Sequence, residues 1–226
     1  MHGRVTKIKG VTFPYFYSMF YLVKTPWWLK KMYPKLVWDM PAGDKTLYLT
    51  FDDGPHETAT AFVLDQLKLY NAKATFFCIG KNVVNNAAVY KRILEEGHAA
   101  GNHTNDHLNG WKTNGDAYLQ NILEAAKHIK SQLFRPPYGR ITRFQSKVLQ
   151  RDSQFKIIMW DVLSGDFDAS ISPEDCLKNV VNNAKPGSII VFHDSAKAFN
   201  RLSYALPRVL GHFTKKGFLF KSLGTK

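Results

Sequence analysis

The sequence predicts an α/β fold in which repeated β-α units build a single parallel barrel domain. From Lys45 onward, short β-rich runs alternate with amphipathic stretches. About seven such runs occur with helices between them, and repeated units of this kind favour a parallel barrel. A chain of 226 residues with 45% hydrophobic content can bury one core of that size. An open doubly wound sheet is the structural alternative.

The first half of the barrel begins with the β-rich run TLYLTF. An Asp-Asp-Gly-Pro turn separates this strand from the helix that follows it. Three glycines, Gly80, Gly97 and Gly101, mark the later joins between elements. The elements expected in this half are a strand at 46–51, a helix at 59–70, a strand at 74–79, a helix at 88–96, a short strand at 99–101 and a long helix at 116–133.

The second half begins with a short strand that runs into Arg135. Pro173 begins a later helix, because the first turn of a helix tolerates proline. The apolar run before His193 predicts a buried strand. The other elements expected here are a helix at 142–151, a strand at 156–161, a helix at 173–183, a strand at 188–193, a helix at 204–216 and a final run at 218–221.

An N-terminal arm, residues 1–44, precedes the domain expected at 45–223. Its stretch 11–23 is apolar and aromatic, but it is too short to span a bilayer, and no small-residue cleavage site follows it. Two tryptophans and two lysines come close behind. Residues 11–31 are therefore expected either to lie on a membrane surface, where aromatic rings and cations sit well at the headgroup level, or to pack across the barrel.

The chain is strongly basic, with 31 Lys and Arg against 18 Asp and Glu and a net charge of +13. This charge favours an anionic partner, and the bacterial cell envelope or a membrane surface is the preferred location, with the cytoplasm as the alternative. The basic residues are scattered and no nucleic-acid motif occurs, so no nucleic-acid partner is expected. The two cysteines, Cys78 and Cys176, have neither CxxC spacing nor a disulfide framework. A monomer is the favoured oligomeric state.

Two polar clusters carry the residue types of a metal site. Asp52 and Asp53 are adjacent carboxylates where a strand enters a turn, so they point in different directions and can take two roles, although Asp-Asp-Gly-Pro is also an ordinary turn sequence. His103 and His107 are four residues apart, a spacing that lets both imidazoles reach one point. With Asp53 they would form the three-ligand set typical of catalytic zinc.

Three more clusters follow expected strands: Arg135–Gly139, Trp160–Phe167 and the strand end at His193 and Asp194. Taken alone, His193 would pass for a strand-end histidine, and Asp161 and Asp166 for loop acids. Their common placement favours another interpretation. The carboxyl ends of parallel strands form the face where barrels and open α/β sheets build their sites.

The ordered motifs resemble the polysaccharide deacetylase family, the NodB-homology domain of carbohydrate esterase family 4, over roughly 45–223. The family pattern TFDDGP is matched by Thr50–Pro55, H-[ST]-x-x-H by His103–His107, and RPPYG by Arg135–Gly139. The last two motifs end at Asp166 and His193. This resemblance implies a distorted (β/α)7 barrel.

The resemblance also implies a role for each matched residue. Asp53, His103 and His107 would hold the metal. Asp52 would act as general base with Arg135 as its partner, and His193 as general acid oriented by Asp166. Phe167 stands where the family usually has Trp, and Val191 where it usually has Leu. The residues expected to face the substrate or the oxyanion are Tyr138, through its backbone N–H, together with Pro137, Trp160, Phe167 and Val191.

The activity that the resemblance implies is metal-dependent hydrolysis of the acetamide of N-acetylated sugars in a glycan of the peptidoglycan or chitin type. Zinc is the expected metal, with cobalt, nickel or manganese as alternatives. An acetylxylan-type O-deacetylase and a catalytically inactive glycan-binding module are the alternative functions. The sequence contains no G-x-S-x-G elbow, no phosphate-binding GxxxxGK[ST] loop and no HExxH helix.

Overall fold

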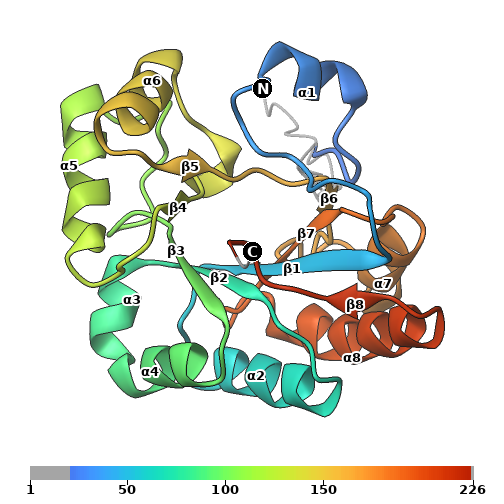
Figure 1. Ribbon diagram of the computed structural model, residues 1–226. Coiled ribbons are helices and arrows are strands. Elements are labelled where there is room, and N and C mark those ends of the chain that lie inside the picture. Colours follow the sequence, from blue (N-terminus) through green and yellow to red (C-terminus); the bar gives the residue numbers. More distant parts are fainter. Residues whose placement is uncertain (1–20, 225–226) are drawn as a thin grey trace, which may run out of the picture.

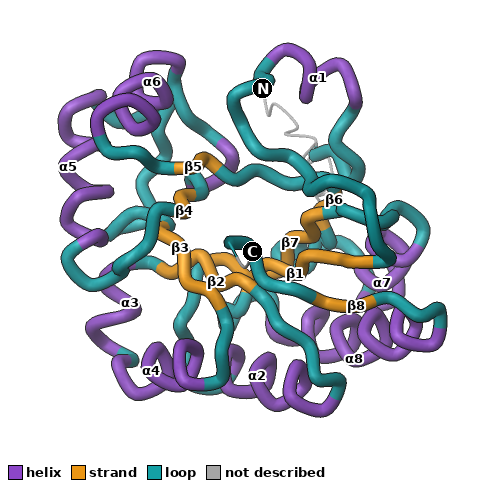
Figure 2. Tube along the Cα trace, in the orientation of Figure 1, coloured by secondary structure: helices purple, strands orange, loops and turns teal. Residues whose placement is uncertain are grey.

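A curled parallel sheet surrounded by helices forms the centre of the computed structural model, which describes residues 21–224 except the side chain of Asp152 (Figure 1). The strand order is β5-β4-β3-β2-β1-β7-β6, and β8 pairs with β1. All the strand pairs are parallel. Figure 2 shows the strands as an arc whose open side faces α1. The expected single-domain α/β fold, a distorted barrel, is confirmed.

The first half of the domain follows the expected order with two differences. A short helix, α3, was not expected, and α5 ends at Ala126 although the helix was expected to reach 133. The elements of this half are β1 (Thr46–Asp52), α2 (Ala59–Leu69), β2 (Thr75–Cys78), α3 (Gly80–Asn85), α4 (Ala87–Glu95), β3 (Ala99–Asn102) and α5 (Gly115–Ala126).

The two differences have tertiary causes. The first N–H groups of α3, on Gly80 and Lys81, donate to the carbonyl oxygens of Thr104 and Asn105, so a distant loop satisfies the start of this helix. The chain leaves α5 early because it must return to pair Phe134 beside β3.

The second half contains one wrong prediction. Within the strand expected at 156–161 only the two-residue strand β5 forms, and the next strand, β6, begins just after that range. The two lie at opposite edges of the sheet. The chain between them crosses the open side of the arc, so continuous pairing over this stretch is excluded. The elements are β4 (Leu133–Phe134), the 3-10 helix η1 (Pro137–Gly139), α6 (Arg143–Asp152), β5 (Lys156–Ile157), β6 (Val162–Leu163), α7 (Pro173–Val181), β7 (Ile189–His193), α8 (Phe199–Lys215) and β8 (Leu219–Phe220).

Local sequence signals explain where several helices begin. The Asn114 side chain caps α5 by accepting hydrogen bonds from the second and third residues beyond it. Thr142 and Gln145 form a capping box at the start of α6. Ser172 caps α7, and Pro173 occupies the first helical position, as expected.

Two of the hydrophobic core clusters pack between the sheet and the surrounding helices. One cluster packs the outer face of β1 and β7 against α2, α7 and α8, and it includes Leu49, Phe51 and Phe192. Another lies beneath α1, α5 and α6, and it includes Trp38 and Phe134. Both clusters consist of fully or nearly fully buried side chains, whose burial stabilises the fold by removing apolar area from water.

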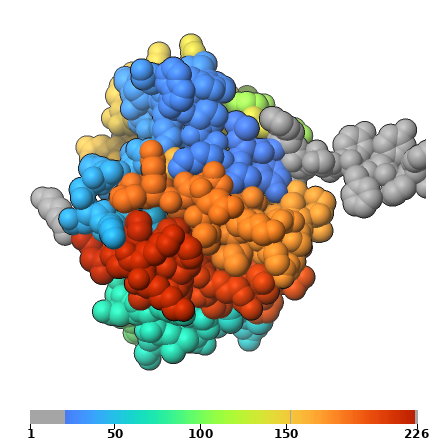
Figure 3. Space-filling model, turned by 90° about the vertical axis from the view of Figure 1, so that its right-hand side faces the viewer, coloured from blue at the N-terminus to red at the C-terminus, as the bar shows by residue number. Residues whose placement is uncertain are grey.

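The segment before β1 lies across the two sheet edges. Lys24 forms an antiparallel bridge with Val162 of β6, and Val37 a parallel bridge with Ile158. Between these bridges lies the helix α1 (Trp27–Met32). Figure 3 shows this segment in blue, covering the upper part of one side of the molecule. The expectation for residues 11–20 lies outside the described residues. Within 21–224, no helix has both the length and the hydropathy needed to cross a bilayer.

Strand register brings the ends of five neighbouring strands close to one level. Asp52 on β1 pairs with His193 on β7 and with Phe77 on β2. On the other side, Asn102 of β3 pairs with Phe134 of β4. Because the strands are parallel, the residues that follow these positions emerge together at the carboxyl end of the barrel.

Candidate active site

Three potential metal ligands converge at this end of the barrel. Single ligand atoms of Asp53, His103 and His107 all lie within 4.8 Å of one another. The Asp53 Oδ1 atom is 3.1 Å from His107 Nε2 and 3.6 Å from His103 Nε2. It is buried and accepts no hydrogen bond of good geometry. One carboxylate and two imidazoles around a shared point fit a divalent transition metal that keeps an open coordination position.

The protonation of two of these ligands suits a cation. The Nδ1–H of His103 donates to the carbonyl oxygen of Arg135 over 2.8 Å, which leaves Nε2 with its lone pair towards Asp53. Burial lowers the pKa of His103 to about 4, so its imidazole is neutral at pH 7. Burial also acts to raise the pKa of Asp53, but the interaction with His107 and the charge on His193 outweigh it and hold that pKa below its usual range.

The histidine loop is held in a sparsely populated backbone conformation. Thr104 and His107 have positive φ values of 64° and 56°. The Asn102 side chain accepts from the Thr104 N–H at 2.8 Å. From α5, the Asn121 side chain accepts from the N–H groups of Asn105 and Asp106 at 2.9 and 3.0 Å. These bonds hold a strained turn that aims both imidazoles at one point.

Asp52 forms a buried ion pair on the floor of the site. Its Oδ1 accepts a hydrogen bond from Arg135 Nη1 at 2.7 Å. The same guanidinium donates to Thr50 Oγ1 and to the Met159 carbonyl oxygen, and it lies over the Phe77 ring at 4.1 Å. Burial lowers the pKa of Arg135, and Asp52 acts against that shift. The guanidinium is thereby fixed, and it fixes the carboxylate.

His193 is held by Asp166 at two points. The His193 Nδ1–H donates to Asp166 Oδ1 and its backbone N–H to Oδ2, each over 2.7 Å. Burial acts to lower the pKa of His193, but the negative charge and hydrogen bond of Asp166 outweigh it and raise the pKa to about 9. The Phe167 ring meets the imidazole edge-on, with centroids 5.1 Å apart. His193 is therefore a protonated, oriented imidazolium at neutral pH.

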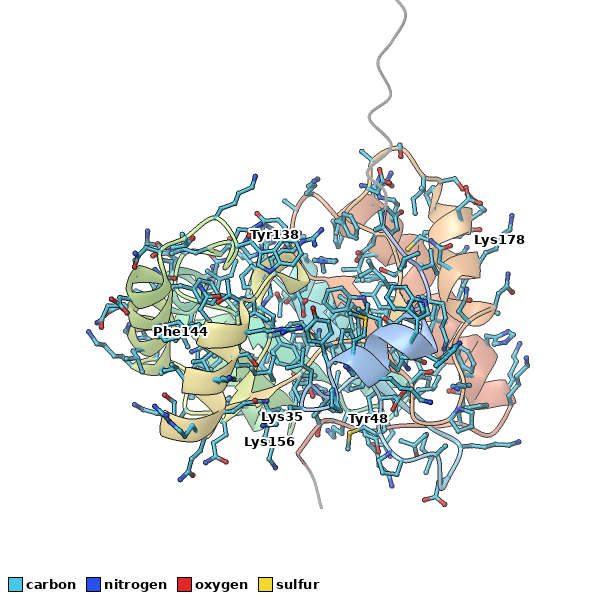
Figure 4. All side chains as sticks on the ribbon, turned by 90° about the horizontal axis from the view of Figure 1, so that it is seen from above. Lys35, Tyr48, Tyr138, Phe144, Lys156 and Lys178 are labelled. Carbon is cyan, nitrogen blue, oxygen red and sulfur yellow. The ribbon has the colours of Figure 1, made fainter. Side chains whose placement is uncertain are left out.

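The remaining expected residues line or support the same end. Tyr138 has a φ of 59°, is 61% exposed, and places its ring 4.7 Å from that of His107. Figure 4 shows Tyr138 at one end of the molecule. Pro137 beside it is buried, and Trp160 packs so closely on Gly139 that a Cβ there would lie 2.7 Å from its ring. Val191 is fully buried and, two residues before the histidine, shares its strand face.

Sequence reasoning assigned no role to Asp194, which supports the carboxylate turn. Its two oxygens accept from the Gly54 N–H at 3.0 Å and from Thr60 Oγ1 at 2.5 Å. Burial raises the pKa of Asp194 to about 7, the Thr60 hydrogen bond acts against that shift, and Asp53 adds to it. The sequence signal that could have identified Asp194 is its position directly after the strand-end histidine, His193.

Asp161 lies elsewhere than its cluster suggested. It precedes β6, and its carbonyl and carboxylate meet residues at the amino end of the sheet: Ser188 Oγ donates to Asp161 Oδ2 at 2.5 Å. Lys24 and Lys30 from the N-terminal segment pair with the two carboxylate oxygens at 2.5 and 2.6 Å. Asp161 and Asp166 lie on either side of β6, which runs from the amino end of the sheet to its carboxyl end. Of these two acids, only Asp166 therefore reaches the active-site end.

Curated relatives share most of this chain. A peptidoglycan-N-acetylglucosamine deacetylase of Bacillus cereus is 35% identical over 191 residues, which cover 82% of this chain and 89% of the relative. A chitooligosaccharide deacetylase of Azorhizobium caulinodans is 33% identical over 156 residues, covering 66% of this chain and 73% of the relative.

A solved structure and a family model agree with these relatives. The crystal structure of a peptidoglycan N-acetylglucosamine deacetylase in complex with 4-naphthalen-1-yl-N-oxidanyl-benzamide superposes with a TM-score of 0.80 at 33% identity, covering 88% of this chain and 95% of that one. The family model described as polysaccharide deacetylase matches residues 39–157. The chain therefore belongs to the polysaccharide deacetylase family, carbohydrate esterase family 4, and is a hydrolytic enzyme of that family.

Proposed function

We propose that this enzyme hydrolyses the acetamide of N-acetylglucosamine units in a peptidoglycan-type glycan, with a divalent metal at Asp53, His103 and His107. The observation that carries the proposal is the convergence of these donors beside two opposed proton-transfer groups, Asp52 and His193. The names of the relatives support the substrate, and peptidoglycan is favoured over chitin oligomers because the relative with the larger shared length acts on peptidoglycan.

The metal supplies Lewis-acid polarisation of the acetyl carbonyl when it is bound. Asp52, held by Arg135, accepts a proton from the attacking water as its oxygen adds to the carbonyl carbon. The backbone N–H of Tyr138 donates to the oxyanion that develops. Tyr138 has a positive φ and follows two prolines, so the direction of its N–H is fixed before substrate binds, which suits this task.

The second half of the reaction belongs to His193. As the carbon–nitrogen bond breaks, the imidazolium gives its Nε2 proton to the departing sugar nitrogen, so acetate and a free amine leave. Asp166 holds the ring by its Nδ1–H and keeps the second nitrogen directed outward. Trp160, Phe167, Pro137 and Val191 would bound the space for the acetyl group and the sugar.

Zinc is the metal we propose, since a set of two histidines and one carboxylate is typical of catalytic zinc sites. Cobalt, nickel and manganese are the competing ions, and stepwise loading of the metal-free protein with each, followed by acetate release, ranks them.

The test is acetate release from peptidoglycan fragments, chitin oligomers and acetylxylan by zinc-loaded, chelated and Asp52→Asn protein. We expect release from the peptidoglycan fragments that needs metal and falls by roughly 10²-fold or more in the variant. Asp65→Asn, on the exposed surface, is the matched control and should leave the rate unchanged. Tight metal binding without release from any substrate would replace the proposal with a glycan-binding module, and preference for acetylxylan would replace it with an O-deacetylase.

A further inference from the structure

One flank of the molecule, formed by α1 and α6, exposes an unusual concentration of large apolar side chains. Among the described residues, five of the thirteen exposed large hydrophobic side chains fall between Leu22 and Tyr33. Trp27 is 69% exposed, Trp28 48% and Met32 58%. We call this flank, together with the groove beside it, the α1–α6 face. Figure 4 is viewed onto this face, with both helices towards the reader.

A groove of about 650 Å³ lies between the segment that follows α1 and the second half of α6. Its floor is apolar and is made by Val37, Phe155 and Ile157, and its rim carries Lys35, Lys147 and Lys156. Figure 4 shows Lys35 and Lys156 close together at the edge of this face.

The groove and the exposed helix form one continuous surface. The side-chain amide of Gln150, on α6, donates to the carbonyl oxygen of Lys35 at 2.8 Å and so ties the segment after α1 to α6. Beneath them, Leu29 and Leu36 pack on the same apolar cluster as Leu149. The aromatic and basic parts of the face therefore keep a fixed relation.

Three lysines of the rim have no acidic partner among the described side chains. Lys35, Lys147 and Lys156 are exposed, and no carboxylate of the described side chains lies within salt-bridge distance of them. On α1, the Lys31 ammonium lies 5.0 Å from the centre of the Trp27 ring. The face thus combines unpaired cations with aromatic rings and an apolar floor.

This combination matches the chemistry of an anionic phospholipid surface. Tryptophan and tyrosine rings are favourable at the headgroup level, and lysines gain from the negative potential of anionic lipids. A net charge of +13 adds long-range attraction. In this view Tyr138, at the active-site end, lies towards one edge, and Lys35 and Lys156 lie towards the opposite edge (Figure 4).

We propose that the α1–α6 face docks the enzyme on an anionic phospholipid bilayer, with Trp27, Trp28 and Met32 at the headgroup level and Lys35, Lys147 and Lys156 against lipid phosphates. This proposal is independent of the acetylated substrate. It differs from anchoring by the first twenty residues, because the structure that binds is a folded face of the domain.

The test is sedimentation of the full chain with vesicles of phosphatidylcholine alone or with 30% phosphatidylglycerol, an anionic fraction of roughly the size that gives a substantial surface potential. The combined variant Lys35→Gln, Lys147→Gln, Lys156→Gln removes the rim charge. The matched control, Lys215→Gln, Lys216→Gln, Lys221→Gln, removes the same net charge from exposed positions at the end of α8 and β8, away from this face.

We expect binding only to the anionic vesicles, weaker at high salt, with at least a roughly tenfold loss of affinity in the rim variant and little change in the control. Trp27→Ala with Trp28→Ala should also weaken binding while acetate release from soluble fragments is kept. If the rim variant and the control lose equal affinity for the vesicles, net charge alone explains the binding. If every variant keeps its affinity, the binding belongs to the residues before Tyr21. Either result overturns the proposal, as does a raised KM for soluble glycan in the rim variant without any vesicle binding.

Discussion

At the scale of single residues, the proposed mechanism gives the Asp166 and His193 pair control of the proton that would leave with the sugar amine. The imidazole is buried, which by itself would favour its neutral form. The negative charge of Asp166 and its hydrogen bond with the ring Nδ1–H reverse that preference. The raised pKa also makes folding stability pH-dependent: the contribution is complete below the unfolded pKa of about 6.5 and is lost as pH rises through about 9.

We predict that Asp166→Asn moves the alkaline limb of the kcat profile to lower pH. Without the carboxylate, burial dominates and the imidazolium loses its proton more readily. The measurement is acetate release between pH 6 and pH 10 (chosen to bracket roughly the expected values), with Asp175→Asn, on an exposed helix start, as control. An unchanged alkaline limb would contradict the assigned role of Asp166.

Gly54 is the residue on which close approach matters most. A Cβ at this position would lie 2.0 Å from Asp194 Oδ2, so the turn that carries Asp52 and Asp53 requires glycine there. We predict that Gly54→Ala costs about 2 kcal/mol of unfolding free energy and most of the activity, because the turn must shift. Urea denaturation and acetate release measure both effects. Gly43→Ala, where a Cβ meets nothing within 4 Å, should change neither.

At the scale of elements, the long strands and amphipathic helices followed from periodicity, and the two-residue strands did not. β1, β7 and α2 were placed within one or two residues because their apolar patterns are long enough to have a period. β5 and β6 are each two residues long and have no period at all. Their partners decide where they lie: β5 pairs with β4 at one edge of the sheet, and β6 pairs with β7 at the other.

The N-terminal segment is an element whose attachment depends on one acid. Asp161 is buried, and its carboxylate holds Lys24 and Lys30 across the open side of the sheet. Burial acts to raise the pKa of Asp161, but the two lysine hydrogen bonds and Ser188 lower it below its usual range. Its stabilising contribution is thus present above about pH 4 and is lost as pH falls through the lowered folded pKa.

We predict that Asp161→Ala lowers the free energy of unfolding by about 2 kcal/mol, less than for a fully buried pair because both lysines keep contact with water. Chemical denaturation at pH 7 tests this, and limited proteolysis should reveal cleavage before β1. Asp44→Ala, at an exposed position just ahead of that strand, is the control. Equal stability of the two variants would show that apolar packing alone holds the segment.

At the scale of the whole molecule, the barrel brings residues from five separate stretches of the chain to one end. Asp53 follows β1 and the two histidines follow β3. Their ligand atoms come within reach of one metal because β2 lies between those two strands and sets their register. Metal binding should therefore stabilise the entire fold, since the unfolded chain cannot assemble the site.

We predict that zinc raises the free energy of unfolding of the metal-free protein by about 2.7 kcal/mol at one hundred times its dissociation constant. Removal by a chelator should reverse the gain, and His103→Ala should abolish it. The readout is the thermal midpoint with and without zinc, together with zinc content. His128→Ala, at an exposed position after α5, should keep the full zinc effect. A zinc effect retained in His103→Ala would place the metal elsewhere.

Much of the site was predictable because its chemistry is carried by short, ordered motifs. Asp52, Asp53, His103, His107, Arg135, Asp166 and His193 were all named from the sequence, and each lies at the expected end of the barrel. The residues that support the site were harder to predict from the sequence. Asp194 and Asn121 act through hydrogen bonds to backbone groups far away in sequence, and a sequence alone does not state which backbone groups lack partners.

The amino-acid sequence alone was sufficient for the fold class, the order of the main elements and the candidate residues that meet at the carboxyl end of the barrel, since these depend on local periodicity and on motif spacing. The pairing of β5 and β6 to opposite edges, the closure of the arc by the N-terminal segment, and the joining of α1 to α6 into one exposed face were settled by folding. The last two features depend on contacts between residues more than a hundred positions apart, such as Lys24 with Asp161 and Lys35 with Gln150. The two short strands pair with β4 and β7, which are neighbours in space rather than adjoining stretches of the chain. No local pattern records such contacts, because packing and loop closure choose among many partners of similar chemistry.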